Sequence, residues 1–211
     1  KYGVPREKPA NYAWMSHAVH HLSSKGRAGI VMPRGTLTSS QGGDDKIRTA
    51  FLDDDVIECI IDLPGQLFFN TQIPSCLWFF NKDKSRWKNK RDGQVLFIDA
   101  RKMGNSISNT QIEFSSEEIQ RIGDTFRAWC DGNYEDVDGF CKSSTRDEIS
   151  NNGDPLSPGR YIGTEEVDSE SDEDFNTRMM SLSEQLSEQL AKSRSLEELI
   201  ANQLKGHGYG V

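Results

Sequence analysis

Residues Ile57–Asn81 read IECIIDLPGQLFFNTQIPSCLWFFN, and this stretch decides the fold of the chain. Two runs of apolar, β-prone residues, 56–63 and 76–80, flank a segment that contains glycine, proline and a pair of adjacent phenylalanines. Apolar runs bounded by Gly and Pro are typical of strands buried on both faces. Because the connection is too short for a helical crossover, we expect an antiparallel pair.

The segment between these predicted strands has an unusual composition for a loop. Phe68 and Phe69 lie next to Asn70, Thr71 and Gln72. Either ring taken singly can belong to the core. Successive side chains of an extended chain point to opposite sides, however, so both rings are not expected in one buried layer. An exposed ring beside amides and a hydroxyl is suited to stacking on a flat, hydrogen-bonding ligand such as a nucleobase.

The surrounding segments alternate between helix and strand patterns. We expect helices over 11–22, with Asn11 as N-cap, and over 44–52, and strands over 27–32 and 94–100. Ser115 and Glu118 have the spacing of a capping box, which predicts a further helix. This rhythm indicates an α/β domain with a mainly parallel sheet, closed at its edge by the hairpin. Residues 132–161 are rich in turn-forming residues and are expected to be irregular, and 165–174 form an acidic linker.

The last part of the chain, 175–204, has the pattern of a long helix with one narrow apolar stripe. One small domain does not offer contacts along the whole length of such a helix with a narrow apolar face. We prefer docking on another chain over packing back on the same domain. The stripe that would form this contact contains Met179, Leu182, Leu186, Leu190, Ile200 and Leu204.

Charge is distributed unevenly along the 211 residues, whose net charge is -8. Residues 1–91 carry 14 Lys and Arg against 9 Asp and Glu, whereas residues 92–211 carry 11 against 24. The basic half is therefore the one that can face phosphate. A basic run interleaved with Trp87 follows the second strand, and its members are either phosphate contacts or a solvated turn: Lys82, Lys84, Arg86, Lys88, Lys90 and Arg91.

Other patterns point away from metal, disulfide and membrane chemistry. The four cysteines lack paired spacing and are interpreted as reduced core thiols. His17, His20 and His21 can bind a metal in principle, but without a further ligand nearby we prefer a polar helix face. No apolar run approaches the roughly 20 residues of a membrane span. Without a signal sequence either, the chain is expected in the cytoplasm.

Five segments together resemble the modification (methylation) subunit of type I restriction-modification systems, an adenine-specific DNA methyltransferase. They are NYAWMSHAVHHLSSKGRAGIVMPRGTL, IRTAFLDDDVIECIIDLPGQLFFNTQIPSCLWFFNKDK, QVLFIDARKMG, GNYEDVDGFCKSST and SPGRYIG. The resemblance runs over nearly the whole chain in the order of the family. It implies a Rossmann-like fold and methyl transfer from S-adenosylmethionine to the exocyclic amino group of a flipped adenine. In the family an aromatic ring on the loop packs on that base, so Phe69 is our first choice for this role and Phe68 the second.

The resemblance also implies which parts are missing. The glycine-rich cofactor loop and the Asn-Pro-Pro-Phe catalytic motif of the family do not occur in this sequence. The chain, which also starts without Met, is therefore expected to be a carboxy-terminal piece that is inactive alone and holds neither catalytic nor cofactor-binding residues. We assign 1–131 to the catalytic domain, 132–174 to a surface segment and linker, and 175–211 to the assembly helix.

The resemblance implies two partners, double-stranded DNA and the DNA-specificity subunit, with the second bound by the tail helix. It leaves open whether a restriction subunit joins the complex. The alternative is a non-catalytic fragment that serves as an interaction module through the same helix.

Overall fold

The computed structural model describes residues 1–69, 71–86, 89–163 and 172–206, and within these ranges all side chains except those of 86, 172–176 and 178. The helices are α1 (Asn11–His21), α2 (Asp44–Asp53), α3 (Ser116–Asp131), α4 (Arg146–Asn151) and α5 (Asp172–Gly206). The strands are β1 (Arg27–Pro33), β2 (Ile57–Asp62), β3 (Ser75–Asn81), β4 (Gln94–Asp99), β5 (Asn105–Ser108), β6 (Gln111–Glu113) and β7 (Cys141–Thr145). Short 3-10 helices include η1 (Arg34–Leu37), η2 (Gln41–Gly43), η3 (Lys84–Arg86) and η4 (Pro158–Arg160).

The main sheet has five strands in the order β1-β3-β2-β4-β7. The predicted hairpin is confirmed, because β2 and β3 pair antiparallel. It does not close the edge of the sheet, since β3 pairs with β1 on its other side, again antiparallel. Among the strand pairings of the described residues, β2 and β4 alone are parallel, and β7 runs antiparallel to β4. The α/β class is therefore correct, while the expectation of a mostly parallel sheet with an edge hairpin is wrong.

The insertion of β3 explains this difference. The helix that joins β1 to β2 sets these two strands in the same direction, as the sequence rhythm predicts. The 12-residue connection 63–74 then brings β3 back between them instead of outside them. Its core-facing rings Trp78 and Phe80 are fully buried, and burying such a ring stabilises the fold by about 1.5–3 kcal/mol.

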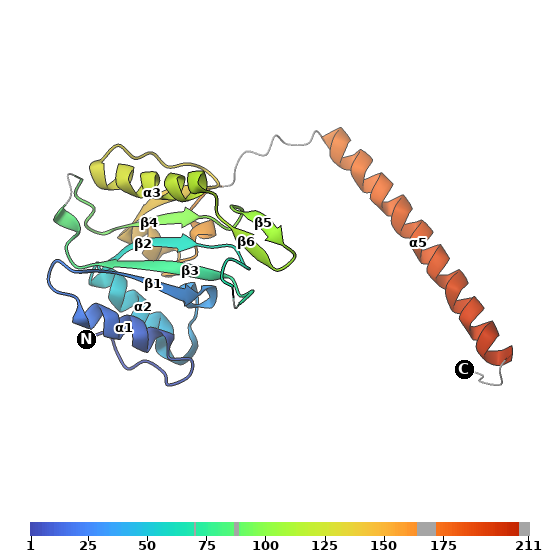
Figure 1. Ribbon diagram of the computed structural model, residues 1–211, viewed down its shortest axis with the longest axis horizontal. Helices are drawn as coiled ribbons and strands as arrows, with labels where there is room; N and C mark the ends of the chain where they lie inside the picture. The colour runs from blue at the N-terminus through green and yellow to red at the C-terminus, as the bar shows by residue number, and fades with distance from the viewer. Residues whose placement is uncertain (70, 87–88, 164–171, 207–211) are drawn as a thin grey trace. The chain divides into compact units, whose positions relative to one another are not determined.

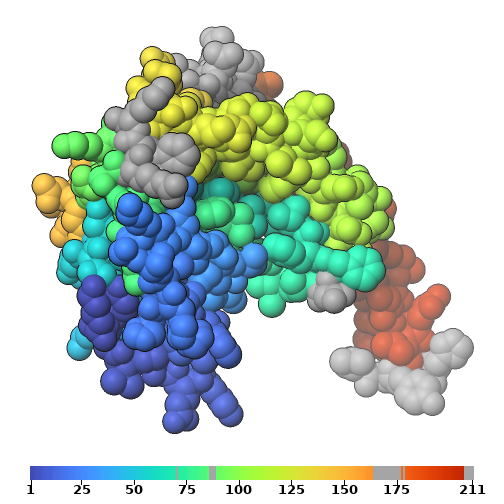
Figure 2. Space-filling view, turned by 60° about the vertical axis from the view of Figure 1, so that its left-hand side comes forward, coloured from blue at the N-terminus to red at the C-terminus, as the bar shows by residue number. Residues whose placement is uncertain are grey.

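Helices cover both faces of this sheet (Figure 1). One core is formed by residues of α1, α2 and α4 that pack on side chains such as Ile60 and Phe97. The other core is formed by α3, with Trp129 packing against the opposite side of the same strands. In the space-filling view, blue α1 and yellow-green α3 lie on opposite sides of the teal strands (Figure 2). Alternating side chains of β4 supply both cores, as the pleat of a strand requires.

Two local expectations need correction. Residues 132–161 are not irregular, because they contain β7 and α4. The strand CKSST is too polar to be recognised by an apolar run, but Thr145 and Glu148 form a capping box like that of Ser115 and Glu118. That spacing was a usable signal. At α1 the N-cap is Ala10 without a side-chain hydrogen bond, so Asn11 lies inside the helix.

The chain divides into two compact units, Lys1–Glu165 and Glu166–Val211. The second unit contains the 35-residue helix α5. Its apolar side chains are exposed: Met179, Leu182, Leu186, Leu190 and Ile200 are between 48% and 60% exposed, and Leu204 is 36% exposed. No helix in the described parts of the chain is both long and apolar enough to cross a bilayer.

Candidate functional site

The carboxyl ends of β1, β2 and β4 meet at one edge of the sheet, on the right in Figure 1. These strands share a direction, because β1 and β2 are both antiparallel to β3 and β4 is parallel to β2. Open α/β sheets bind ligands at this end of their strands. The aromatic loop follows β2 at this edge, which makes the edge the candidate site.

The loop presents the second phenylalanine to solvent. Phe69 is 88% exposed and Phe68 is 37% exposed. The Thr71 backbone N–H donates to the Phe68 carbonyl at 3.2 Å, and the Thr71 hydroxyl accepts from the Ile73 backbone N–H at 3.1 Å. Both rings are exposed, and Phe69 is the more exposed of the two. Asn70, the first of the expected loop supports, lies outside the described residues.

A small hairpin and a close backbone approach brace this loop. The Ile112 backbone N–H, on β6, donates to the Gln66 carbonyl at 3.0 Å. Gly65 is the position of close approach, because a Cβ atom there would lie 3.0 Å from the carbonyl oxygen of Gln72. The Gln72 backbone therefore lies close against Gly65, and the Gln72 side chain is exposed. The loop is held at both ends while Phe69 projects from it.

Charged residues that the sequence analysis did not select lie directly below the loop. Asp62, the last residue of β2, is fully buried, and its Oδ2 lies 2.9 Å from Arg34 Nε and 3.6 Å from Arg101 Nε. Asp99, at the matching position of β4, accepts from Arg101 Nε at 2.8 Å. Each carboxylate ends a strand, and that position was the signal that could have identified them.

The pKa values of the two carboxylates are shifted in opposite directions. Burial raises the pKa of Asp62 above its usual value, although Arg34 and Arg101 lower it. Burial also acts to raise the pKa of Asp99, but hydrogen bonds from Arg101 outweigh it, so the pKa of Asp99 is lowered. The cluster therefore consists of two arginines, Arg34 and Arg101, paired with two carboxylates, of which Asp62 is the more buried.

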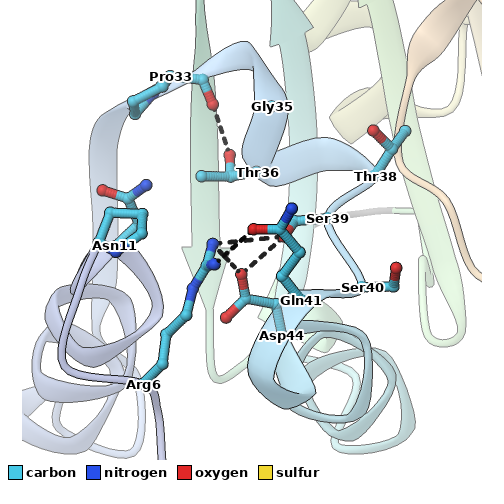
Figure 3. A pocket seen from close by; sticks show the side chains of 11 residues that line it. Arg6, Asn11, Pro33, Gly35, Thr36, Thr38, Ser39, Ser40, Gln41 and Asp44 are labelled. Carbon is cyan, nitrogen blue, oxygen red and sulfur yellow. Dashed lines mark hydrogen bonds and ion pairs between the residues drawn. The ribbon is translucent and has the colours of Figure 1, made fainter.

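Two hollows lie on either side of the segment that follows β1. One, of about 390 Å³, is lined by Arg34, Leu37, Thr38, Ile73, Pro74 and Ser157 among others. The other, of about 420 Å³, contains the ion pair of Arg6 with Asp44, whose Nη2 and Oδ2 atoms are 2.7 Å apart (Figure 3). There Arg6 also donates to Gln41 Oε1 at 2.9 Å, so its charge is engaged within the chain. Only the first hollow touches the base of the aromatic loop.

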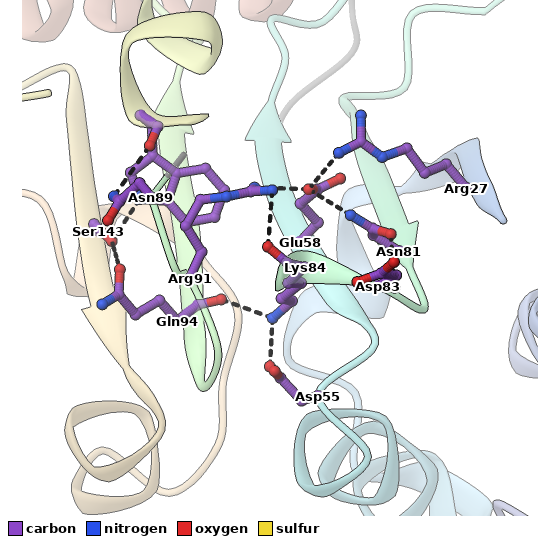
Figure 4. A network of polar contacts seen from close by, with 11 residues as sticks. Arg27, Asp55, Glu58, Asn81, Asp83, Lys84, Asn89, Arg91, Gln94 and Ser143 are labelled. Atoms are coloured by element: carbon purple, nitrogen blue, oxygen red, sulfur yellow. Dashed lines mark hydrogen bonds and ion pairs between the residues drawn. The ribbon is translucent and has the colours of Figure 1, made fainter. Parts of the chain in front are cut away.

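The basic run after β3 lies at the opposite end of the sheet, and part of its expected role is corrected. Lys84 is 3% exposed and Arg91 is fully buried. Arg91 Nη1 lies 2.7 Å from Glu58 Oε1, and Lys84 pairs with Asp55 and donates to the Gln94 carbonyl at 2.8 Å (Figure 4). Burial lowers the pKa of Lys84. These two cations hold the turn from inside and do not reach a phosphate.

The other members of the run have different surroundings. Lys82 donates to the Leu22 carbonyl at 2.8 Å, and Lys90 is exposed. The side chain of Arg86 and the whole of Lys88 lie outside the described residues. Any phosphate contact by these four residues remains a prediction.

The histidines of α1 lie along one helix face. The rings of His17 and His21 are 4.2 Å apart between centroids, and His21 Nδ1 bonds the His17 carbonyl at 2.9 Å. That bond uses one ring nitrogen of His21 within the helix itself. Among the described residues, no group of three or more His, Cys, Asp and Glu side chains is arranged to hold a metal ion.

Comparison with known proteins matches residues 1–170 to the model of the N-6 DNA Methylase family. The chain is 43% identical over 210 residues to the HindI methylase subunit of a type I restriction enzyme from Haemophilus influenzae, covering 99% of this chain and 46% of that protein. It is 35% identical over 212 residues to the MjaIX methylase subunit from Methanocaldococcus jannaschii, covering 99% and 37%. The chain thus spans less than half the length of these two relatives.

A solved structure shows the same likeness. The methyltransferase subunit of a type I restriction-modification system from Streptococcus thermophilus superposes with a TM-score of 0.66 at 29% identity. The match covers 76% of this chain and 32% of that one.

Proposed function

The chain belongs to the N-6 DNA methylase family, and on that premise we propose that it is part of a DNA adenine methyltransferase subunit in a type I restriction-modification complex. Its role there is to hold the target adenine after the base has left the helix. One observation carries this role: Phe69 is 88% exposed on a braced loop at the carboxyl edge of the sheet.

Base flipping explains why an aromatic ring would be exposed on this loop. The amino group of an adenine inside duplex DNA cannot be reached by a methyl donor, so the base must leave the stack at a cost of a few kcal/mol. Stacking on an aromatic side chain returns about 1–3 kcal/mol per base. Phe69 is the ring we assign to this contact, and Phe68, which is 37% exposed, is the second choice. Thr71 and Gln72 support the loop, together with Asn70.

The methyl donor we propose is S-adenosylmethionine, but the described residues do not fit it. A sulfonium cofactor needs accessible acceptors for its ammonium and ribose groups. At the carboxyl edge Asp62 is fully buried, and Asp99 is bonded to Arg101. Arg34 and Arg101 would repel the sulfonium charge. We therefore place the cofactor and the groups that orient the amino nitrogen on residues outside this chain.

The relatives of this chain are long enough to carry the cofactor site on residues outside it. The relatives from Haemophilus influenzae and Methanocaldococcus jannaschii are named methylase subunits, and the chain covers 46% and 37% of them. We propose that these 211 residues correspond to the carboxy-terminal part of such a subunit, acting in the cytoplasm. Membership of a methylase family disfavours the alternative that the chain is only a non-catalytic interaction module.

The tail helix is proposed as the contact to the DNA-specificity subunit. Its apolar side chains from Met179 to Leu204 are exposed in the described structure. Exposed apolar stripes of this kind mark helix-in-groove or coiled-coil contacts. Whether a restriction subunit is a third member of the complex stays open.

Product analysis tests the proposed activity. The complete subunit, assembled with its partners, is incubated with labelled S-adenosylmethionine and duplex DNA, and the DNA is hydrolysed to nucleosides for mass spectrometry. We expect label on the exocyclic amino group of adenine. Label on cytosine, or no transfer at all, would contradict the proposal.

Calorimetry tests where the cofactor binds. S-adenosylmethionine should bind the complete subunit, whereas residues 1–211 alone should show no binding heat. Tight binding by these residues alone would overturn the assignment of the cofactor site to other parts of the protein.

A further inference from the structure

Two arginines approach the buried end of β2 from either side. Arg34 follows β1 and Arg101 follows β4, and their Nε atoms lie 2.9 and 3.6 Å from Asp62 Oδ2, at ion-pair distance without a hydrogen bond. The Nε–H of Arg101 donates to Asp99 instead. Asp62 has no exposed surface, while each arginine side chain is 38% exposed. The carboxylate is thus an internal anchor, and the guanidinium groups reach from it to the surface.

Arg34 keeps hydrogen-bonding capacity at that surface. Its Nε is the atom that faces Asp62, and within the described part of the chain its Nη1 and Nη2 atoms have no protein acceptor. Its backbone N–H donates to the Pro74 carbonyl at 3.2 Å, which fixes it beside the end of the aromatic loop. A guanidinium whose ion pair lies on the Nε side leaves its two terminal nitrogens as a fork, which matches two oxygens of a phosphate.

The adjoining hollow has mixed lining. Arg34 provides the cation, Ile73 and Pro74 provide apolar surface, and Thr38 and Ser157 provide hydroxyl groups in a volume of about 390 Å³. Ile73 is 63% exposed although it is apolar. One charge, an apolar wall and hydroxyl groups suit a sugar-phosphate unit of a nucleic acid chain.

We propose that Arg34, oriented by Asp62 and flanked by Arg101, contacts a backbone phosphate of the DNA strand that carries the target base. This inference rests on the proposed function, because it assumes that the loop holds a flipped base of that DNA. The contact fixes the position of the strand next to Phe69 without reading its sequence. Holding the guanidinium before DNA arrives reduces the ordering cost of binding.

Salt dependence of DNA binding separates this role from simple neutralisation of Asp62. Loss of one phosphate contact lowers the slope of log affinity against log salt by about 0.9. For Arg34→Gln in the complete assembled subunit, we expect this loss of slope with both cognate and non-cognate duplexes. Arg34→Lys keeps the charge and should recover the slope, although not the fork geometry.

Arg34→Gln alone leaves Asp62 buried without its nearest cation and can impair folding. The double variant Arg34→Gln with Asp62→Asn removes both charges together and keeps the local balance. Its slope should also fall by about 0.9. A folded double variant with the wild-type slope would show that Arg34 only neutralises Asp62, and would overturn the inference.

Lys25→Gln is the matched control. Lys25 is exposed in the turn that precedes β1, at the opposite end of the strand that Arg34 follows. The control loses the same charge and should keep the wild-type slope. An equal fall in both variants would reflect overall charge and contradict a specific contact.

The two proposals can fail separately. If the wild-type subunit methylates adenine but the slope of the Arg34 double variant is unchanged, only the phosphate contact is wrong. If the wild-type subunit binds no DNA and transfers no methyl group, the proposed function itself fails, and the inference with it.

Discussion

Arginine serves two different purposes in this chain, and burial decides which. Arg91 is fully buried, with its Nη1 2.7 Å from Glu58 and its guanidinium carbon 4.6 Å from the centroid of the Trp129 ring. Arg34 is 38% exposed on its side chain and keeps its outer nitrogens at the surface. The first is a structural residue, and the second is available to a ligand.

Replacing Arg91 with Ala tests the structural purpose. The change would leave Glu58 buried with fewer compensating charges, and breaking a buried pair costs about 3–5 kcal/mol. Urea unfolding should therefore show a clearly lower midpoint. Lys90→Ala, at the exposed neighbour, should stay within about 0.5 kcal/mol of wild type. Equal midpoints for both variants would show that the Glu58 network contributes little.

Sequence alone could not separate these arginines. Lys84 and Arg91 stand in a basic run that looks like a solvated or phosphate-binding turn. Their partners Asp55 and Glu58 are 29 and 33 residues away in the chain and become neighbours only when the sheet forms. The exposed aromatic ring was predictable only in part. Alternation indicates that Phe68 and Phe69 do not share one buried layer, whereas the choice of Phe69 over Phe68 comes from the family resemblance.

At the scale of elements, the strands and helices with strong periodicity were predictable and their order in the sheet was not. The β2–β3 hairpin and the capping box of α3 are both present. The position of β3 between β1 and β2 depends on pairing between distant segments, which no local pattern encodes. β7 was not predicted, because its sequence CKSST has no apolar run and the strand forms by pairing with β4.

Helix α5 provides a prediction at the same scale. Leu186 is 58% exposed within the apolar stripe. If this stripe binds the DNA-specificity subunit as proposed, Leu186→Asp should abolish that association, measured by size-exclusion chromatography or calorimetry, because a charge would be buried in an apolar contact.

The control for this prediction lies on the other side of the same helix. Ser195 is nine residues further on, about two and a half turns. Ser195→Asp adds the same charge and should leave association intact. If Leu186→Asp still assembles, the stripe is not the interface.

At the scale of the whole unit, the cysteines report on the integrity of both cores. Cys76 lies in the core under α1 and α2, and Cys59, Cys130 and Cys141 lie in the core under α3. All four are free and buried. Native protein should therefore react with a thiol reagent only after unfolding, and then at all four positions at the same rate. Rapid reaction of one cysteine in the native state would indicate that its core opens separately.

Alkaline pH should lower the stability of the unit Lys1–Glu165, because its thiols are buried. Burial raises the pKa of Cys76 from 9.0 to about 11. The stabilisation from keeping this thiol neutral is complete below pH 9.0 and is lost as the pH rises through about 11, because the unfolded chain deprotonates first. Thermal melting should show Tm falling across this window, and less steeply for Cys76→Ala. An identical slope in both proteins would contradict the assignment.

The central claim is that Phe69 holds the flipped adenine, and the rate of methyl transfer by Phe69→Ala beside Phe69→Tyr tests it most directly. Because Phe69 is 88% exposed, neither change should alter Tm. Loss of the stacking ring should cost about 1–3 kcal/mol of transition-state stabilisation and so lower kcat/KM roughly 5- to 160-fold, while Tyr keeps the ring and most of the rate. A wild-type rate for Phe69→Ala would contradict the claim, and an inactive Phe68→Ala beside it would transfer the role to Phe68.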